Sequence, residues 1–345
     1  MKKSFLKDVL DQPQYLREAI KNYSLNKIDL LSQKIASGNI KRIILTGHGS
    51  SFNSLYPAYL KLCANFLPVM LWQTAELVHY GFNQVDSGTL LCVNSQSGRS
   101  AEVVHLVEKI SEKRPGYLLA FTNDPSSVLG SSADGILQLH AGEEHGVAVK
   151  TYMNALCLSS LFAAQLCGEN MEAACGSMLA ACDAMETYLN DWETKSKEIE
   201  TKYGEIKRTV IIGRGPSLAS AMNAALNQKE AAWLFTEGMS AAEFRHGPLE
   251  LADENLKLIV LEGDRMTSEF NVALAEDVKK YGGEIIWIGN NPPEKFQNID
   301  FPKVDDIARP LVELLPLQLL ANQLAQRQNI EAGKFRFIGK VVMKE

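Results

Sequence analysis

The chain has 345 residues, of which 46% are hydrophobic and 22% charged, and a net charge of −6 at pH 7. This length and composition are typical of one large or two ordinary globular domains. The acidic balance, without a basic run longer than a pair, excludes a nucleic-acid surface. No stretch holds the roughly 18 apolar residues of a membrane span. The start of the chain lacks the apolar core of a signal peptide, so we expect neither nucleic acid nor membrane as a partner.

Cysteine and histidine spacing argues against disulfides and metal sites. No CxxC pair occurs, so we expect buried thiols in a reducing cytoplasm, without a disulfide or metal framework. The six histidines do not pair at metal-ligand spacing. No P-loop, nicotinamide fingerprint or GxSxG elbow is present, and we expect an enzyme that needs no cofactor and no metal. The cysteines are Cys63, Cys92, Cys157, Cys167, Cys175 and Cys182.

Helical and strand patterns alternate along the first half of the chain. Apolar residues at three- and four-residue steps predict helices over 1–40, broken at Pro13. Short apolar strands are predicted at 42–46, 90–94 and 118–122, with a helix over 101–113 between the last two. Strands that alternate with helices at this spacing predict an α/β fold, a parallel sheet with helices on both faces.

The second half repeats this pattern. A shift of 166 residues places Lys41 on Lys207, the strand at 90–94 on 256–260, and Gly116 on Gly282, without a gap. We interpret this as an internal duplication of one α/β unit, each copy a flavodoxin-like three-layer sandwich.

The segments between and after the two copies are predicted to be helical. Residues 152–166 are apolar on all sides, which predicts a buried helix, and 178–207 are polar, which predicts an exposed linker helix. An amphipathic helix is predicted near 309–328. The predicted domains are a helical lead-in (1–40), a first domain (41–185), a linker helix (186–206) and a second domain with a tail (207–345).

Two serine-bearing loops follow adjacent predicted strands. They read Gly-His-Gly-Ser-Ser at 47–51 and Ser-Gln-Ser-Gly-Arg-Ser at 95–100. Both fall at carboxyl ends of parallel strands, where open α/β sheets bind ligands. Hydroxyls and helix N-termini without a P-loop lysine suit a sugar phosphate monoester. The alternative is that these serines only cap helices.

Candidate catalytic groups lie in the second copy and in the tail. Glu230 falls in the helix after Gly213-Arg214-Gly215, and His246 falls on a loop stiffened by glycine and proline. A carboxylate and a loop-borne histidine can move protons on a small molecule. Lys340 in the tail could form an imine with a ketose. The alternatives are a surface salt bridge for Glu230 and a solvated tail lysine.

These motifs resemble those of the sugar isomerase (SIS) family, specifically enzymes with two SIS domains, over nearly the whole chain. The segment 7–16 is similar to the lead-in of the isomerase half of glucosamine-6-phosphate synthase. The motifs that carry the resemblance are GHGSSFNS (47–54), SQSGRSAE (95–102), GVAVKTY (146–152), GRGPSLASAMNAALNQKE (213–230) and EFRHGPLEL (243–251).

The resemblance implies aldose–ketose isomerisation of a hexose 6-phosphate, often with an amine at C1 or C2. It implies that Glu230 moves a proton between C1 and C2, that His246 assists ring opening across a dimer interface, and that Lys340 matches a lysine that forms an imine with the sugar. It places Val147 in the segment that closes the sugar pocket. The residues implied to hold phosphate and sugar are Gly49, Ser50, Ser51, Ser95, Gln96, Ser97 and Ser100.

The chain departs from the synthase pattern at several positions. Asn227 stands where the synthase has a lysine, and His48 replaces a cysteine beside the phosphate-loop glycine. A glutaminase domain and its Cys at position 2 are missing from the sequence, so we expect no glutamine hydrolysis by this chain. The tail reads FIGKVVMKE in place of LAKSVTVE, and EFRHGPLE is closer to the fructosamine-6-phosphate deglycases.

The expected function is therefore a deglycase or deaminase acting on an aminated or glycated hexose 6-phosphate. The alternatives are a plain aldose–ketose phosphosugar isomerase and a non-catalytic sugar-phosphate-binding regulator. A shared active site implies a homodimer or a dimer of dimers. The amine partner of the sugar is left open.

Overall fold

The structure is a computed structural model that describes residues 3–23, 25–65, 68–337 and 339–343, and its chain forms two compact units. The first unit comprises Gln14–Glu144, Ala148–Leu179 and Arg336–Glu345; the second comprises Met1–Pro13, His145–Val147 and Ala180–Phe335. The predicted domain boundaries at 40, 185 and 206 remain a prediction. No helix among the described residues is both long and apolar enough to cross a membrane.

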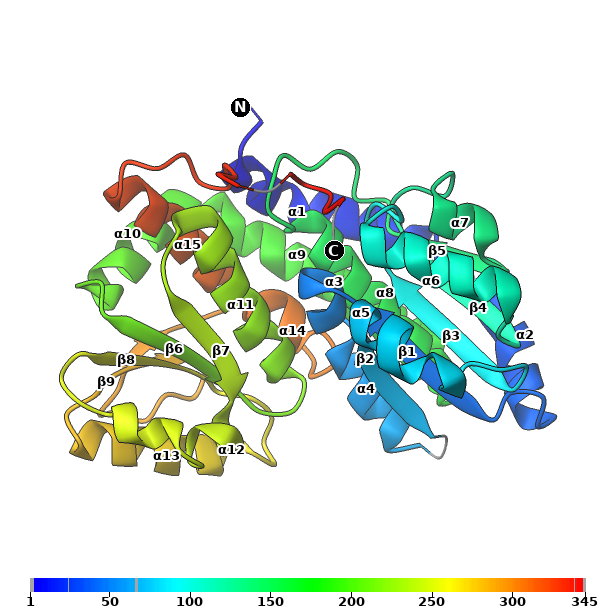
Figure 1. The fold of residues 1–345 in the computed structure, drawn as a ribbon. Coiled ribbons are helices and arrows are strands. Elements are labelled where there is room, and N and C mark those ends of the chain that lie inside the picture. Colours follow the sequence, from blue (N-terminus) through cyan, green and yellow to red (C-terminus); the bar gives the residue numbers. More distant parts are fainter. Residues whose placement is uncertain (1–2, 24, 66–67, 338, 344–345) are drawn as a thin grey trace. The chain divides into compact units, whose positions relative to one another are not determined.

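The first unit is built on a parallel five-stranded sheet with the strand order β2-β1-β3-β4-β5 (Figure 1). This is the flavodoxin-like order, in which β1 and β3 flank the point where the connections reverse. The strands are β1 (Arg42–Gly47), β2 (Val69–Gln73), β3 (Thr89–Asn94), β4 (Tyr117–Thr122) and β5 (Gly135–Gln138). The accompanying elements are the part of α1 (Phe5–Lys21) from Gln14 onward, α2 (Leu25–Ala36), α3 (Gly49–Asn53), α4 (Tyr56–Cys63), α5 (Thr74–Glu76), η1 (Leu77–Gly81), η2 (Phe82–Gln84), α6 (Ala101–Glu112), α7 (Val128–Ser132) and α8 (Lys150–Leu166).

Strand residues of this sheet alternate between two apolar cores. Ile43 and Leu45 of β1 pack with residues of α2, α4 and α8, whereas Ile44 packs with residues of η1, α6 and α7 on the opposite face. Successive side chains of a strand point to opposite faces, and helices cover both, so the strands are apolar throughout. The predicted three-layer arrangement is confirmed for this unit, including the buried helix near 152–166, which is α8.

The second unit repeats the architecture with the order β10-β9-β8-β6-β7, the same order when numbered within the unit. One apolar core packs β6, β8 and β9 against α12 and α13, and α11 packs with α15 and β7 (Figure 1). The strands are β6 (Arg208–Gly213), β7 (Thr236–Ser240), β8 (Leu256–Leu261), β9 (Glu284–Ile288) and β10 (Gln297–Ile299). The remaining elements are α9 (Met171–Asn190), α10 (Trp192–Tyr203), α11 (Ser217–Ala232), α12 (Ala241–Phe244), η3 (Pro248–Leu251), α13 (Ser268–Lys280), α14 (Arg309–Val312) and α15 (Leu315–Arg327).

Strand registers confirm the duplication but correct its alignment. Arg42 pairs with Thr89 in the first sheet, and Arg208 pairs with Leu256 in the second. The β1 and β6 strands therefore match at the predicted shift of 166, whereas β3 and β8 match at one residue more. The β2 and β7 strands already carry this extra residue. The predicted gap-free alignment is wrong, because the connection from β6 to β7 is one residue longer than its counterpart.

The predicted break at Pro13 is also wrong, since α1 continues through this residue. A proline inside a helix leaves the carbonyl four residues earlier without its backbone donor. Here the Gln12 Nε2 donates to the Val9 carbonyl oxygen at 2.9 Å and to Gln318 Oε1 at 2.9 Å. The side chain of Gln12 thus replaces the missing N–H, and the helix remains intact.

The prediction of buried thiols holds for half of the cysteines. Cys92, Cys157 and Cys182 are buried, while Cys63 is exposed and the remaining two, Cys167 and Cys175, are half-buried. All six are free thiols. The polar segment predicted as one linker helix is divided between the end of α9 and α10, which meet at Asp191.

Candidate active site

The first serine loop turns sharply from β1 into α3. Gly49 has φ +50°, a left-handed conformation that glycine adopts without strain. Gly47 lies so close to the next strand that an added Cβ would stand 3.0 Å from the carbonyl oxygen of Asn94. These two glycines let the chain reverse over the sheet edge, and they leave the Ser50 and Ser51 side chains half-buried there.

His48 ties this loop to the neighbouring strand. Its Nε2 accepts a hydrogen bond from the backbone N–H of Ala75 at 2.9 Å, at the start of α5. Nε2 is therefore an acceptor in this arrangement, so the ring orients the loop instead of offering this nitrogen to a ligand. The histidine that replaces the cysteine of the synthase pattern thus has a structural partner on the β2 side.

The second serine loop follows β3, directly beside the first. Ser95 is buried and its Oγ accepts the N–H of Gly98 at 3.1 Å, while the Ser97 Oγ accepts the N–H of Arg99 at 3.2 Å. Ser100 is the N-cap residue of α6, yet its side chain makes no capping hydrogen bond. The alternative interpretation, in which these serines only cap helices, therefore does not describe Ser100. Its hydroxyl stays available beside the N-terminus of a twelve-residue helix.

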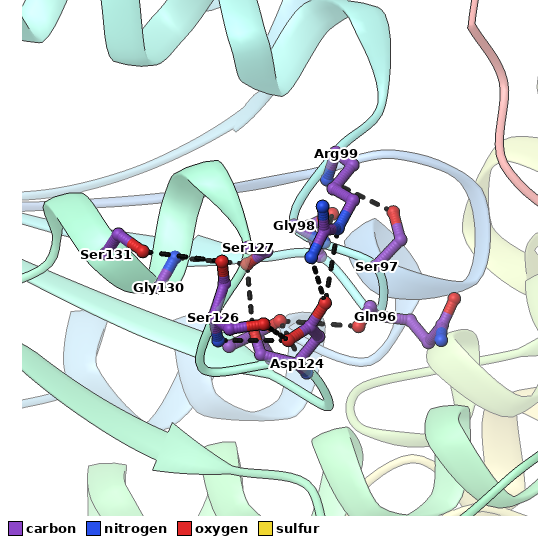
Figure 2. A network of polar contacts seen from close by, with 11 residues as sticks. Gln96, Ser97, Gly98, Arg99, Asp124, Ser126, Ser127, Gly130 and Ser131 are labelled. Carbon is purple, nitrogen blue, oxygen red and sulfur yellow. Dashed lines mark hydrogen bonds and ion pairs between the residues drawn. The ribbon is translucent and has the colours of Figure 1, made fainter.

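A polar network fixes the shape of this second loop from the β4 side (Figure 2). The Gln96 carbonyl oxygen accepts the N–H of Asn123 at 3.0 Å. Gly98 has φ +60°, and an added Cβ there would stand 2.0 Å from the Ser127 Oγ. The Arg99 Nη2 donates to Asp124 Oδ2 at 2.6 Å. The loop is thus held in place before any ligand arrives, as electrostatic preorganisation requires.

Asp124 is the charged centre of this network. Its Oδ1 accepts the N–H of Ser126 at 2.9 Å and the hydroxyl of Ser126 at 2.6 Å. The Ser126 hydroxyl, together with the Arg99 guanidinium, lowers the pKa of Asp124 to about 2. Asp124 is therefore ionised at neutral pH, and Arg99 is engaged with it.

The C-terminal tail lies against the same loop. The backbone N–H of Ala101, the first residue of α6, donates to the carbonyl oxygen of Val342 at 3.1 Å. Lys340, two residues before Val342, donates through Nζ to the Glu144 carbonyl oxygen at 2.5 Å and lies 3.3 Å from Glu144 Oε2. Lys340 therefore lies, like the serines, at the carboxyl end of the strands of the first sheet. The tail residues 338, 344 and 345 lie outside the described part of the chain.

Glu144 is a residue that the sequence analysis missed. It is buried, and its carboxylate accepts the N–H of Val149 at 2.8 Å and both the N–H and hydroxyl of Thr151. It thus holds the start of α8 and the tail together. A glutamate just before the Gly-Val-Ala-Val segment was the available signal, but nothing local indicates a partner 196 residues away.

Val147 is buried in the second unit. Its neighbour Gly146 lies against Gly333, where an added Cβ would stand 2.3 Å from the Gly333 carbonyl oxygen. The N–H of His145 donates to Asp8 Oδ2 at 2.8 Å. The segment 145–147 is therefore packed tightly at the backbone, and a role of Val147 in closing the sugar pocket remains a prediction.

Glu230 stands in the last turn of α11 and is half-buried. The helix ends at Trp233, a non-glycine residue with φ +53°. The last carbonyl groups of α11 accept hydrogen bonds from outside the helix. The Ala231 carbonyl oxygen accepts the N–H of Gly333, and the Ala232 carbonyl oxygen accepts Gln328 Nε2. The C-terminal turn that carries Glu230 is thus anchored to the segment after α15.

His246 lies on the turn between α12 and η3 and is exposed. Its N–H donates to the Glu243 carbonyl oxygen at 2.9 Å, and Arg245 forms a 2.7 Å ion pair with Asp277. Gly247, with φ +129°, follows it. The backbone around His246 is thus held in place while its ring is exposed, and a catalytic role for this ring remains a prediction.

The structure thus brings the predicted binding residues together in the first unit, at the ends of β1 and β3, with Lys340 beside them. Glu230, His246 and Val147 belong to the second unit. Among the described residues no group of three potential ligands from histidine, cysteine and acidic side chains could hold a metal ion.

Comparison with known proteins identifies the family. The profile of the SIS domain matches residues 38–165 and again residues 202–325. These two matches cover both sheets and most of the chain. The chain therefore belongs to the SIS domain family and contains two SIS domains.

Individual relatives are consistent with this assignment. Glutamine–fructose-6-phosphate aminotransferase (isomerizing) from Pyrococcus horikoshii is 31% identical over 99% of this chain and 57% of its own length. The chain thus spans a little over half of that curated relative. The C-terminal domain of glucosamine-fructose-6-phosphate aminotransferase from Francisella tularensis has the same fold, with a TM-score of 0.83 and 22% identity over 97% of this chain and 99% of that one. Glucosamine-6-phosphate deaminase from Thermotoga maritima superposes with a TM-score of 0.76 at 18% identity, over 99% of both chains.

Proposed function

We propose that this chain is a phosphosugar isomerase-type enzyme that acts on an aminated or glycated hexose 6-phosphate and releases the amine. The observation that supports it best is the pair of serine loops at adjacent strand ends, with the tail lysine beside them. The family and two of its relatives, an isomerizing aminotransferase and a glucosamine-6-phosphate deaminase, are consistent with this substrate class.

The serine loops of the first unit form the proposed phosphate site. Ser50, Ser51, Ser97 and Ser100 offer hydroxyl donors, and the N-terminus of α6 adds a positive dipole end. No lysine or arginine is needed for a monoester held by several neutral donors. Arg99 already binds Asp124, which leaves recognition of the phosphate to hydroxyls and backbone N–H groups.

Glu230 and His246 are the groups that we propose for proton transfer. In a ketosamine 6-phosphate, Glu230 would take the proton from C1 and return it to C2, so that C1 becomes an imine with the amine partner. Water then adds to C1 and the C–N bond breaks, which yields an aldose 6-phosphate and the free amine without net oxidation or reduction. His246 would assist ring opening, as a neutral imidazole can donate and accept a proton near pH 7.

Lys340 has two possible roles in this scheme. In the structure its ammonium is bound to Glu144, which is the geometry of a latch for the tail. The resemblance implies an imine with the sugar, for which Lys340 would have to leave Glu144. Both roles need the tail at the second serine loop, so removal of the tail should abolish turnover in either case.

The decisive experiment is an assay of the purified chain on fructosamine 6-phosphates and on glucosamine 6-phosphate, with separation of products. We expect release of amine and a hexose 6-phosphate, a fall of kcat by at least about 1000-fold in Glu230→Gln, and a smaller fall in His246→Ala. Full activity in both variants contradicts the assigned roles. Isomerisation without loss of nitrogen would instead favour a plain aldose–ketose isomerase.

Two further parts of the proposal concern assembly and the non-catalytic alternative. We propose a homodimer or dimer of dimers in which His246 serves the partner's site, a role with which the exposure of its ring in the single chain is consistent. Mixing Glu230→Gln with His246→Ala should then give more activity than the sum of the two variants measured separately. Tight binding of a hexose 6-phosphate without turnover of any substrate would favour a regulator.

A further inference from the structure

A second candidate site lies in the first unit, away from the serine loops. A cavity of about 410 Å³ opens between α1 and the segment that follows β5, and a neighbouring cavity of about 360 Å³ shares Gln138 and His140 with it. None of the residues predicted to bind or convert the sugar phosphate lines either cavity. The larger cavity is lined by Gln14, Tyr15, Glu18, Asn123, Gln138, His140 and Gly142.

Three polar side chains of the larger cavity are uncommitted. Within the described ranges, the side chains of Gln14, Gln138 and His140 form no hydrogen bond or ion pair. His140 also has φ +50°, one of three positive values among described residues other than glycine. Such a conformation is strained, and it persists only where the surroundings impose it. Two amides and an imidazole thus face one hollow without a protein partner.

The walls of the cavity are held by other residues. Asn123 clamps the loop on both sides, since its Nδ2 donates to the Gly142 carbonyl oxygen at 2.9 Å and its Oδ1 accepts the N–H of Ala141 at 2.9 Å. Gly142, with φ +62°, lies so close to Tyr15 that an added Cβ would stand 2.5 Å from its ring. The ammonium of Lys150 lies 4.3 Å from the centre of the same ring. The hollow is therefore preformed, as small-molecule sites generally are.

The charge of the lining selects the class of ligand. Glu18 is the only lysine, arginine, aspartate or glutamate among the residues that line the two cavities. Its Oε1 accepts Asn22 Nδ2 at 2.9 Å, while its Oε2 takes no donor among the described residues. The Glu18 carboxylate repels phosphate and favours an ammonium group. The amides suit the hydroxyls of a polyol, for which they can donate and accept.

We propose that this cavity binds an unphosphorylated amino sugar, with its amine at Glu18 and its hydroxyls at Gln138, His140 and Gln14. The volume of about 410 Å³ is in the range of small-ligand pockets.

The cavity also has a physical connection to the serine loops. Asn123, which clamps its wall, donates its backbone N–H to the Gln96 carbonyl oxygen of the second loop at 3.0 Å. The segment 140–144 that forms the other wall ends at Glu144, which holds Lys340 of the tail. An occupant that shifts this segment would alter both contacts. We therefore expect an amino sugar in the cavity to change KM for the sugar phosphate by about threefold or more, an effect that rests on the proposed function, whereas binding itself does not.

The test is isothermal titration of the whole chain with D-glucosamine, with D-glucose and inorganic phosphate as comparison probes. We expect a millimolar Kd or tighter for glucosamine, weaker binding of glucose, and no competition by phosphate. Gln138→Ala and Glu18→Gln should each weaken glucosamine binding by about tenfold. His140→Gly should do the same without loss of stability, because glycine relieves the positive φ.

The matched control is Ser97→Asp, which disables the second serine loop and should leave glucosamine binding unchanged. Equal affinity in the native chain and in all three cavity variants overturns the proposal. Loss of binding in Ser97→Asp places glucosamine at the serine loops and also overturns it. Absence of binding at about 20 mM glucosamine does so as well. Turnover of hexose 6-phosphates is measured separately, so failure of the proposed function leaves this outcome readable.

Discussion

The two SIS domains place different chemistry at the same point of the fold. The first residue after β3 is Ser95, and the first residue after the matching strand β8 is Glu262. Glu262 uses its carboxylate internally, with Oε2 accepting the N–H of Asn290 at 2.6 Å and Oε1 accepting Asn291 Nδ2 at 2.7 Å. Asp264, two residues on, likewise accepts the N–H and the hydroxyl of Thr267. The two carboxylates after β8 therefore accept donors of the protein itself, from the loop after β9 and from Thr267.

The loops after β1 and β6 also differ in whether their serine hydroxyls are already bound within the protein. The first domain carries Ser50 and Ser51 after Gly49, whereas the second carries Pro216 and a buried Ser217 after Gly215. The Ser217 Oγ donates to Glu313 Oε2 at 2.9 Å and is thus occupied within the protein. Both glycines have positive φ, so the turn itself is retained.

This difference shows that the fold alone does not make an anion site. Both sheets present helix N-termini at their carboxyl ends, but a carboxylate at about 4 Å from a phosphate costs about 4 kcal/mol at an effective dielectric near 20. Serine hydroxyls stabilise the loop of the first domain and still leave donors for a ligand.

The largest effect is expected when a carboxylate of the second domain is introduced at the matching position of the first domain. Ser97→Asp introduces the carboxylate that Asp264 provides after β8, and it should weaken binding of glucosamine 6-phosphate by at least about 100-fold, because the ligand is a dianion. Titration calorimetry measures the effect, and Ser97→Asn, of similar size and without charge, is the control. An unchanged Kd in Ser97→Asp would show that phosphate binds elsewhere.

A second comparison concerns glycines in the loops after β3 and β8. Gly98→Ala should cost about 3 kcal/mol of the free energy of unfolding, because φ is +60° and the new Cβ would stand 2.0 Å from Ser127 Oγ. Gly263→Ala, with φ +75° but 3.3 Å of room to Thr267 Oγ1, should cost only about 1 kcal/mol. Urea unfolding of both variants gives the difference; equal losses would mean that backbone strain, not the clash, governs this loop.

The third prediction concerns two buried glutamates, one in each unit. Complete burial raises the pKa of Glu313 to about 7, although the Ser220 and Ser217 hydroxyls and Arg309 act to lower it. The folded protein then holds a proton that the unfolded chain releases near the ordinary glutamate pKa of 4.5. The contribution of Glu313 to the free energy of unfolding is fully present below pH 4.5. It is lost as the pH rises through the folded-state pKa of about 7.

Glu313→Gln should therefore remove a decline in stability of up to about 1.4 kcal/mol per pH unit in this window. Denaturant unfolding across the range measures it. Glu144, which meets Lys340 and three donors of α8, is the contrasting case, and Glu144→Gln should loosen the tail instead. A decline that persists unchanged in Glu313→Gln would assign it to another group.

The smallest effect is expected at Asp124. Its pKa of about 2 reflects the Ser126 hydroxyl and Arg99, so its contribution is present above pH 3.8 and is lost as pH falls through about 2. Asp124→Asn should lower Tm slightly at pH 7, because the network is exposed, and the difference from the native chain should vanish at the acid end. A large loss of Tm at neutral pH would show that the Asp124 network supports more than the second serine loop.

Part of this architecture could be predicted from periodicity. Apolar strands at 42–46, 90–94 and 118–122, each followed by a polar turn, indicated parallel sheets, and the repeated Lys-Arg strand start indicated duplication. The strands at both edges of each sheet, β2, β5, β7 and β10, were missed. Edge strands of three or four residues carry too few alternating positions to be distinguished from loops.

The serine loops could likewise be located from sequence. Small polar residues between a parallel strand and the next helix lie at the carboxyl end of the sheet, and this does not depend on the rest of the chain. Three features required tertiary structure. Gln12 could stand in for the missing N–H of Pro13 only because Gln318 packs beside it. The extra residue between β6 and β7 appears only in the strand register. The pairing of Lys340 with Glu144 joins two segments that no local pattern connects, since a buried carboxylate finds its donors through the fold and not through its neighbours in sequence.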